Sequence, residues 1–301
     1  MLGERGISAS ETAAASYAAA AVEKIDCGDA VLALRRYGSG PPLMLVHGFP
    51  LHGYTWRKVL PALARQHTCL VVDLAGLGDS EWSAATAFNF EDHARRLKTL
   101  ADKLGLQRYS LMAQDTGATV ARCLALADGA RVDKLILINT EMPGHRPPWI
   151  VPYQYAMRWL PGTKLSFKLL MQSRAFLRSG MGFGGCFKDL GLIEGDFSVQ
   201  FVRPYIESKR RMDGLGLYLG GLYWDTVDGL RERHAQLKMP VLLIWGEDDP
   251  TFPIALVREM AKQIPDCRLV AIPGARLLVH EERPDEVTKA ALPFLAVPLA
   301  P

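Results

Sequence analysis

Short apolar runs alternate with amphipathic stretches along most of this 301-residue chain, and that alternation constrains the fold more than any other feature. The runs are rich in leucine and β-branched residues, and the stretches between them carry apolar residues at helical spacing. This order predicts parallel strands joined by crossover helices. The expected strands are 30–37, 43–46, 68–72, 109–112, 134–139, 241–245 and 268–272. The expected helices are 56–65, 90–104, 116–127, 253–263 and 284–295.

The alternation stops between residues 142 and 227, where proline-rich, glycine-rich and aromatic segments such as PGHRPPWIVPYQY and SGMGFGGCF replace it. We therefore expect one α/β core, formed by residues 25–141 and 228–301, with residues 142–227 inserted as a helical cap. Residues 1–24 are expected to be a helical extension, because Ser8 and Glu11 have the spacing of a capping box.

Composition limits the expected partners. The formal charge is only +3, with no alternation of basic and aromatic residues, so we expect a small-molecule substrate and neither nucleic acid nor a membrane. The five cysteines are scattered and show no CxxC spacing, which favours reduced thiols in a cytoplasmic protein without a metal site or cofactor. The N-terminus is not typical of a signal peptide, and we expect a monomer or a homodimer.

The segment SLMAQDTGATVARCLALA reads as a strand, a tight turn and a helix. Ala113, Asp115 and Gly117 form a small-x-acid-x-small pattern, in which small neighbours let the turn close and expose the middle side chain. Asp115 is therefore the candidate nucleophile. The alternative is that Asp115 only caps the following helix, a role that aspartate performs well.

Two other strand ends carry candidate residues, and the carboxyl ends of parallel strands are where such sheets bind ligands. In LMLVHGFP, Gly48 permits a turn that aims the Phe49 amide at a developing negative charge, with the Thr116 amide as the second donor. In VLLIWGEDDP, Asp249 is placed to orient a histidine, or alternatively to cap the next helix.

Together, HGFP, DLAGLGDS, the QDTG turn and HEERPDE resemble the α/β-hydrolase superfamily, in its branch of epoxide hydrolases, haloalkane dehalogenases and fluoroacetate dehalogenases. The resemblance runs from about residue 30 to 295. It implies the α/β-hydrolase fold, with a mostly parallel central sheet flanked by helices. It also implies that Asp115 attacks carbon to form an alkyl-enzyme ester, that a histidine activates water, and that Asp249 or Glu141 is the acid that orients this histidine.

Departures from the family patterns bear on the substrate. Haloalkane dehalogenases typically have an Asn and a Trp where this chain has Phe49 and Thr116, and fluoroacetate dehalogenases usually have an Arg at the Thr116 position. Haloalkanes and fluoroacetate are therefore less favoured as substrates. Epoxide hydrolases share HGFP and use cap tyrosines as proton donors. The candidate cap tyrosines are Tyr153, Tyr155, Tyr205, Tyr218 and Tyr223.

The expected base is missing. The family loop commonly reads PGAGHxxHEERP, with the first histidine as base, whereas this chain reads PGARLLVHEERP. Without gaps, Leu277 takes the base position and His280 matches the second, noncatalytic histidine. Leucine cannot accept a proton, so turnover of the ester is expected to be altered or impaired. His280, His52 and His145 are the candidate replacement bases, and we favour the outcome that none of them stands in the standard place.

Three functions therefore stay open. The leading one is a hydrolase of the epoxide hydrolase or dehalogenase type, with Asp115 ionised at pH 7 because its reference pKa is about 3.9. The second is a non-hydrolytic biosynthetic enzyme, such as a cyclase, isomerase or lyase, with Asp115 as acid or base. The third is a pseudoenzyme that binds an apolar ligand. In addition to the tyrosines, Trp149 and Arg276 are expected to contact the small molecule.

Overall fold

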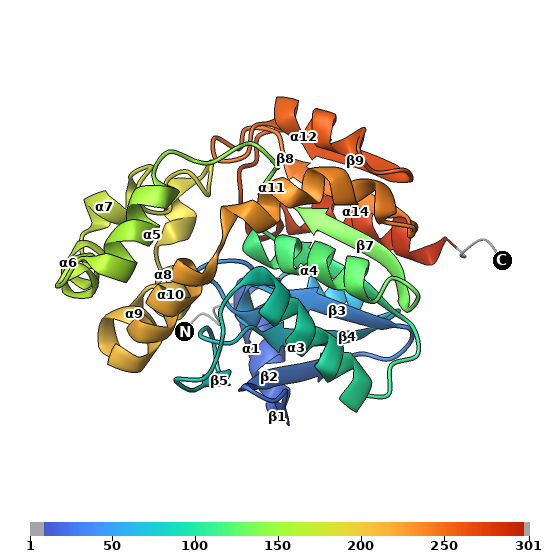
Figure 1. Cartoon of the computed structure of the whole chain (residues 1–301), viewed down its shortest axis with the longest axis horizontal. Helices are drawn as coiled ribbons and strands as arrows, with labels where there is room; N and C mark the ends of the chain where they lie inside the picture. The colour runs from blue at the N-terminus through green and yellow to red at the C-terminus, as the bar shows by residue number, and fades with distance from the viewer. Residues whose placement is uncertain (1–8, 298–301) are drawn as a thin grey trace, which may run out of the picture.

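The computed structural model describes residues 9–297 and shows one mixed sheet with helices on both faces (Figure 1). The strand order is β1-β2-β4-β3-β6-β7-β8-β9, with β5 paired to β2. Strand β2 is antiparallel to its neighbours β1, β4 and β5, and all other pairs are parallel. The strands are β1 (Glu23–Asp26), β2 (Ala30–Tyr37), β3 (Pro42–Val46), β4 (Thr68–Asp73), β5 (Glu81–Trp82), β6 (Tyr109–Gln114), β7 (Val132–Ile138), β8 (Val241–Gly246) and β9 (Cys267–Ile272).

All seven expected strands are present, and the expected α/β class with a mostly parallel sheet is confirmed. The central strands are recognisable because helices cover both faces of the sheet, so they read as continuous apolar runs. Strand β8, for example, is buried at every position. Strands β1 and β5 were not expected, because β1 alternates charged and apolar residues at the sheet edge and β5 has only two residues.

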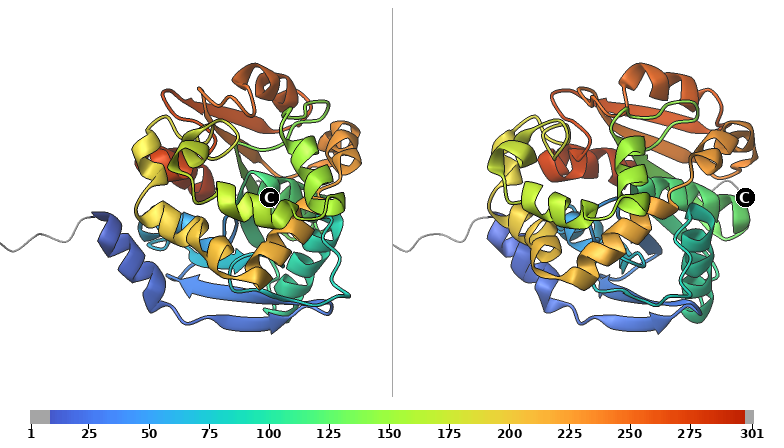
Figure 2. Two further views of the ribbon diagram at one scale, coloured as in Figure 1. Left: turned by 90° about the vertical axis from the view of Figure 1, so that its left-hand side faces the viewer. Right: turned by 60° about the vertical axis from the view of Figure 1, so that its left-hand side comes forward.

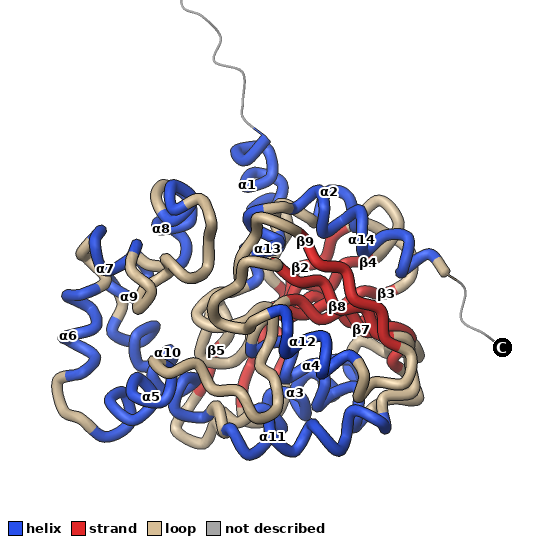
Figure 3. Tube along the Cα trace, turned by 90° about the horizontal axis from the view of Figure 1, so that it is seen from above, coloured by secondary structure: helices blue, strands red, loops and turns tan. Residues whose placement is uncertain are grey.

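Helices cover the two faces of the sheet as separate sets (Figure 3). One set comprises α2 (Leu60–Leu63) and α14 (Pro284–Ala296), with the short α13 (Val279–Glu282) close by. The other comprises α3 (Phe90–Lys103), α4 (Thr116–Ala127), α11 (Trp224–Arg233) and α12 (Ile254–Ala261). The helix expected at 56–65 is instead a 3-10 turn, η1 (Gly53–Trp56), followed by α2, because Pro61 starts a new helix in its own first turn.

A layer of helices connects β7 to β8 and lies beside the carboxyl ends of the parallel strands (Figures 1 and 2). The expected limit of the cap at residue 227 falls inside α11. Among the described helices, none is both long and apolar enough to cross a bilayer. The elements of this connection before α11 are α5 (Ile150–Trp159), α6 (Thr163–Leu170), α7 (Arg174–Arg178), η2 (Leu190–Ile193), α8 (Asp196–Phe201), α9 (Arg203–Glu207) and α10 (Lys209–Gly221), and η3 (His234–Gln236) follows it.

The N-terminal helix α1 (Ala9–Ala19) packs against the antiparallel part of the sheet. The backbone oxygen of Tyr17 accepts a hydrogen bond from the Tyr37 hydroxyl at 2.7 Å, and the Tyr17 ring stacks on the Tyr37 ring. This contact fixes the helix on β2. The expected capping pair of Ser8 and Glu11 cannot be compared, because Ser8 lies outside the described residues.

Candidate active site

Asp115 lies in the sharp turn between β6 and α4. Its φ of 52° and ψ of −133° fall outside the conformations that most residues adopt. The turn needs glycine at position 117, where a Cβ would lie 2.7 Å from Val46 O. The Asp115 side chain makes no capping bond to α4 and instead borders an internal cavity. The geometry therefore matches the exposed middle residue of an elbow rather than a helix cap.

Two backbone amides bind the Asp115 carboxyl group. The Phe49 amide donates to Oδ2 at 2.8 Å, and the Thr116 amide also bonds to the carboxyl. Close approach requires Gly48, because a Cβ there would lie 2.6 Å from Oδ2 of Asp115. The two donors expected from the sequence thus meet at one carboxyl group.

The charges around Asp115 do not favour its ionised form. Burial raises the pKa of Asp115 well above its usual value, the negative charge of Glu141 raises it further, and the two amides oppose both effects. Among the described residues, no Lys, Arg or His borders the cavity. The structure therefore shifts this group towards the neutral acid, against the expectation from its reference pKa.

Glu141 is the second carboxyl group that borders the cavity. Its Oε2 accepts hydrogen bonds from the hydroxyl groups of Thr119 at 2.6 Å and Thr140 at 2.9 Å. The Arg122 guanidinium lies behind these hydroxyl groups and donates to Thr119 Oγ1 at 2.7 Å and to the Glu141 backbone oxygen at 2.8 Å. Burial lowers the pKa of Arg122 to about 10, so it remains a cation next to Glu141.

Asp249 is buried, does not border the cavity, and has no histidine partner among the residues that the structure describes. Its Oδ2 accepts a hydrogen bond from Asn139 Nδ2 at 2.7 Å, and its Oδ1 accepts one from the Thr251 amide at 2.8 Å. Burial raises the pKa of Asp249 to about 7, against the opposing effect of the Asn139 bond. Asp249 thus lies where an acid partner is expected, without a group to orient.

Leu277 borders the cavity at the position predicted for the base. His280 lies elsewhere: its Nε2 is 2.6 Å from Thr55 Oγ1, its ring packs on Trp56, and burial lowers its pKa to about 4. His52 and His145 bond to the backbone oxygens of Gln200 and Thr251. None of these three histidines borders the cavity, so the structure brings no replacement base from this set to Asp115.

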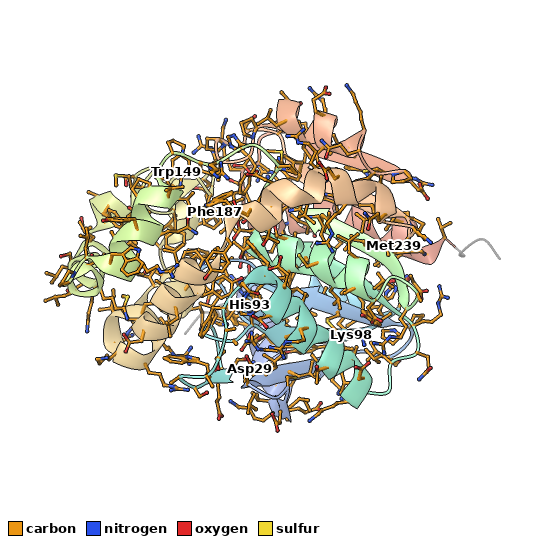
Figure 4. All side chains as sticks on the ribbon, in the orientation of Figure 1. Asp29, His93, Lys98, Trp149, Phe187 and Met239 are labelled. Atoms are coloured by element: carbon orange, nitrogen blue, oxygen red, sulfur yellow. The ribbon has the colours of Figure 1, made fainter. Side chains whose placement is uncertain are left out.

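The cavity itself is apolar and has a volume of about 160 Å³. Core and cap both contribute to its wall, and Trp149 of the cap, labelled in Figure 4, is one of the lining residues. Its polar lining is sparse. The titratable or hydroxyl-bearing residues that border it are Asp115, Thr116, Glu141, Tyr153, Cys186 and Thr251.

A family model described as the alpha/beta hydrolase fold matches residues 41–284 of this chain. The chain belongs to the α/β-hydrolase fold family. The match spans β3 to the start of α14, so it includes the elbow, both amide donors and the loop that carries Leu277.

Known relatives of this α/β hydrolase include two kinds of hydrolase at low identity. Haloalkane dehalogenase 2 of Mycobacterium bovis is 26% identical over 257 residues, covering 85% of this chain and 88% of the relative. Epoxide hydrolase 3 of Xenopus tropicalis is 26% identical over 263 residues, covering 85% and 71%. Among solved structures, the epoxide hydrolase CorEH superposes with a TM-score of 0.76 at 24% identity, covering 92% of this chain and 98% of that one, which supports the fold.

The structure separates the expected substrate contacts of this α/β hydrolase into three groups. Trp149 and Tyr153 border the cavity. Tyr218 is buried behind its wall, with its Oη 3.0 Å from Thr116 Oγ1. Tyr155 and Tyr223 are exposed, and Arg276 donates to the backbone oxygens of Gly184 and Phe187.

Sequence reasoning missed the polar support beneath the site. Arg122 is the one charged residue in the otherwise apolar helix α4, a signal that could have marked it as a buried partner. Asn139 and Thr140 lie directly before Glu141 in the segment INTE, and only the structure shows that they bind Asp249 and Glu141.

Proposed function

We propose that this α/β hydrolase acts on a small, largely apolar epoxide or haloalkane through Asp115 as nucleophile, with an alkyl-enzyme ester as intermediate. One observation carries the proposal: the carboxyl group of Asp115 is presented in an elbow to an apolar cavity, with Oδ2 2.8 Å from the Phe49 amide. The other carboxylate oxygen is available to attack carbon, and the amide donors then stabilise charge on the ester oxygen during hydrolysis.

An epoxide fits this site better than a haloalkane. Ring opening leaves an alkoxide that needs a proton, and hydroxyl groups lie next to Asp115: Thr116 borders the cavity, and its Oγ1 lies 3.0 Å from Tyr218 Oη. Burial raises the pKa of Tyr218, so this tyrosine keeps its proton. A departing halide instead needs side-chain N–H donors, and Phe49 and Thr116 offer none.

The missing histidine bears on turnover. Leucine at position 277 cannot activate water, so ester hydrolysis is expected to be slower than ester formation. Loss of one member of a catalytic triad typically costs on the order of 10⁴-fold or more in rate. The leading function therefore includes a long-lived ester.

A second function is favoured by the raised pKa of Asp115. A neutral carboxyl group donates a proton rather than attacking carbon, and Glu141 borders the same cavity as a proton acceptor. This pair suits a non-hydrolytic isomerase, cyclase or lyase acting on a small apolar molecule.

Intact-mass spectrometry distinguishes these functions. The protein is incubated with 1,2-epoxyhexane, styrene oxide and 1-bromohexane, and its mass is followed with time beside that of Asp115→Asn. A mass increase equal to one epoxide, or to 1-bromohexane less HBr, that is absent in the variant supports nucleophilic attack. Turnover or isomerisation without any adduct, even after acid quench within milliseconds, favours the acid–base function. If the probes bind tightly but neither form an adduct nor turn over, the protein has a ligand-binding role and the proposed hydrolase function is wrong.

A further inference from the structure

Among the described residues, Glu141 is the one remaining carboxyl group that borders the cavity and can accept a proton there once Asp115 has become an ester. Besides Asp115, the titratable side chains that border the cavity are Glu141, Tyr153 and Cys186. Burial raises the pKa of the Cys186 thiol and that of Tyr153, so both hold their protons. The chemistry of the lining therefore leaves Glu141 as the base.

Glu141 is also close to the reacting group. The Thr140 hydroxyl lies 2.9 Å from the Asp115 backbone oxygen and 2.9 Å from Oε2 of Glu141, so one hydroxyl group spans the two residues. Oε2 is held by the hydroxyl groups of Thr140 and Thr119, and no hydrogen bond from a described residue to Oε1 is present. The second oxygen of this carboxylate is thus free to bind water.

We propose that Glu141 directly activates the water that hydrolyses the Asp115 ester, in place of the histidine that this chain lacks. Glu141 takes a proton from water, and the water oxygen attacks Cγ of Asp115. The ester C–O bond then breaks, the departing alkoxide takes the proton from Glu141, and Asp115 regains its carboxyl group as the neutral acid, which contains one oxygen and one proton from water. This role rests on the proposed function, and it differs from orienting a histidine because Glu141 contacts the reacting water itself.

Adduct decay tests this role separately from adduct formation. Wild type, Glu141→Gln and Asp249→Asn are loaded with 1,2-epoxyhexane, freed of excess reagent, and followed by intact mass in H₂¹⁸O. We expect all three to load and Glu141→Gln to decay at least 10²-fold more slowly than wild type. Asp249→Asn should decay at nearly the wild-type rate, because Asp249 has no histidine to orient.

Other outcomes separate the two proposals. If all variants load and Glu141→Gln decays as fast as wild type, Glu141 is not the base, although Asp115 remains the nucleophile. If none loads and none turns over, the nucleophile proposal fails and this one fails with it. Glu141→Asp is a control for a folding defect, because it keeps a carboxylate at this position. The adduct of Glu141→Asp should therefore decay faster than the adduct of Glu141→Gln.

Helices α5 and α6 carry exposed apolar side chains on their outer side, which we call the outer cap surface. Seven large apolar side chains there are between 44% and 63% exposed. Those on α5 recur every four residues, which places them on one side of the helix. Figure 2, left, shows both helices on the side of the molecule that faces the viewer. The seven residues are Val151, Tyr155, Trp159, Leu160, Leu165, Leu169 and Leu170.

The segment that carries the outer cap surface has charged side chains of one sign. Residues 142–188 contain seven lysines and arginines and no aspartate or glutamate. Several pair with acids from other segments, such as Lys164 with Asp213. Among the described residues, Arg158 and Lys168 form no ion pair, and the Arg158 guanidinium lies 5.0 Å from the Trp159 ring centroid.

We infer that the outer cap surface adsorbs to an anionic lipid bilayer. Exposed Trp and Leu beside Lys and Arg is the composition of interfacial helices, in which the apolar side chains enter the interface and the basic ones are attracted to anionic lipid. A second copy of this chain fits less well, because a two-fold contact through this surface would bring the basic residues of both copies together with no acid from the segment 142–188 to pair with them. The small net charge of the whole chain conceals this local imbalance.

The same helices connect the outer cap surface to the cavity. Tyr153 and Met157 of α5 and Phe167 of α6 border the cavity from inside. Gly180 and Met181 border the cavity and are also exposed, so the cavity lining reaches the protein surface there, and the Tyr153 hydroxyl donates to the Met181 oxygen at 3.1 Å. An adsorbed protein could therefore take an apolar substrate directly from lipid.

Vesicle flotation tests the inference. The full chain is mixed with vesicles of phosphatidylcholine alone or with about one third phosphatidylglycerol, at low and high salt. We expect binding to the anionic vesicles that falls with salt, and at least a fivefold loss in Trp159→Ser/Leu165→Ser or Lys168→Glu. Leu256→Ser, an exposed leucine on α12, is the matched control and should bind as wild type does. Absence of vesicle binding, or a dimer in solution that Trp159→Ser/Leu165→Ser dissociates, overturns the inference.

Discussion

The Phe49 amide nitrogen lies 2.8 Å from Oδ2 of Asp115, although 66 positions separate the two residues. The parallel pairing of β3 with β6 brings them together, because it aligns Val46 with Ala113 and ends both strands at the same edge. Gly48 completes the approach. Fold topology and one glycine therefore create the contact on which the proposed nucleophile depends.

Gly48→Ala should disrupt this contact. Its Cβ would meet Asp115 Cβ and lie 2.6 Å from Oδ2, so the carboxyl group must move away from the Phe49 amide. We expect adduct formation to slow by about 10²-fold, the usual cost of losing one such donor. Gly185→Ala is the matched control: it borders the same cavity, with its nearest neighbour 3.6 Å from the new Cβ. Equal rates for both variants would contradict the role of the amide.

Leu277→His should speed hydrolysis of the ester. The new imidazole would stand beside the cavity at the position predicted for the base, on a loop whose Ala275 oxygen accepts a hydrogen bond from the Asp248 amide, next to Asp249. We expect adduct decay to rise by roughly 10²- to 10⁴-fold, the usual contribution of a positioned base. Leu277→Asn controls for polarity and should not accelerate decay. Adding Asp249→Asn to Leu277→His should remove most of the gain.

Adduct formation should depend on pH through Asp115. Because burial and then the charge of Glu141 raise its pKa, only the ionised fraction attacks, and the rate should climb up to tenfold per pH unit below that pKa. Glu141→Gln removes one negative charge and should move the rise to lower pH. Glu259→Gln, on the exposed side of α12, should leave the profile in place. A flat wild-type profile from pH 5 to 9 would show that Asp115 is fully ionised throughout.

Elements that depend on a short stretch of sequence could be predicted from that stretch alone. The strand, turn and helix around Asp115 could be predicted because a buried parallel strand reads as an apolar run and the elbow needs small neighbours at fixed spacing. Leu277 could be placed because the flanking PGA and HEERP fix its register. The expected interior strands and the core helices after residue 90 were found for the same reason.

Contacts between distant segments could not be predicted in this way. Arg122, Thr119 and Thr140 meet Glu141 only because α4 packs beside the end of β7. The raised pKa of Asp115 has the same origin, since burial and neighbouring carboxylates are properties of the folded molecule. Among the cap tyrosines, Tyr153 and Tyr155 are two positions apart on α5, yet one borders the cavity and the other is 60% exposed.

His280 should make stability fall in acid. Burial lowers its folded pKa to about 4, below an unfolded value of about 6.5, so the unfolded chain takes up a proton first. The contribution of His280 to the free energy of unfolding is therefore complete above pH 6.5 and is lost as the pH falls towards 4. Urea unfolding at pH 7.5 and pH 5 should show wild type losing about 2 kcal/mol more than His280→Gln. Thr55→Val removes the hydrogen bond but keeps the imidazole, so it should retain the wild-type loss; a loss in wild type no larger than that in His280→Gln would mean that His280 is already protonated in the fold.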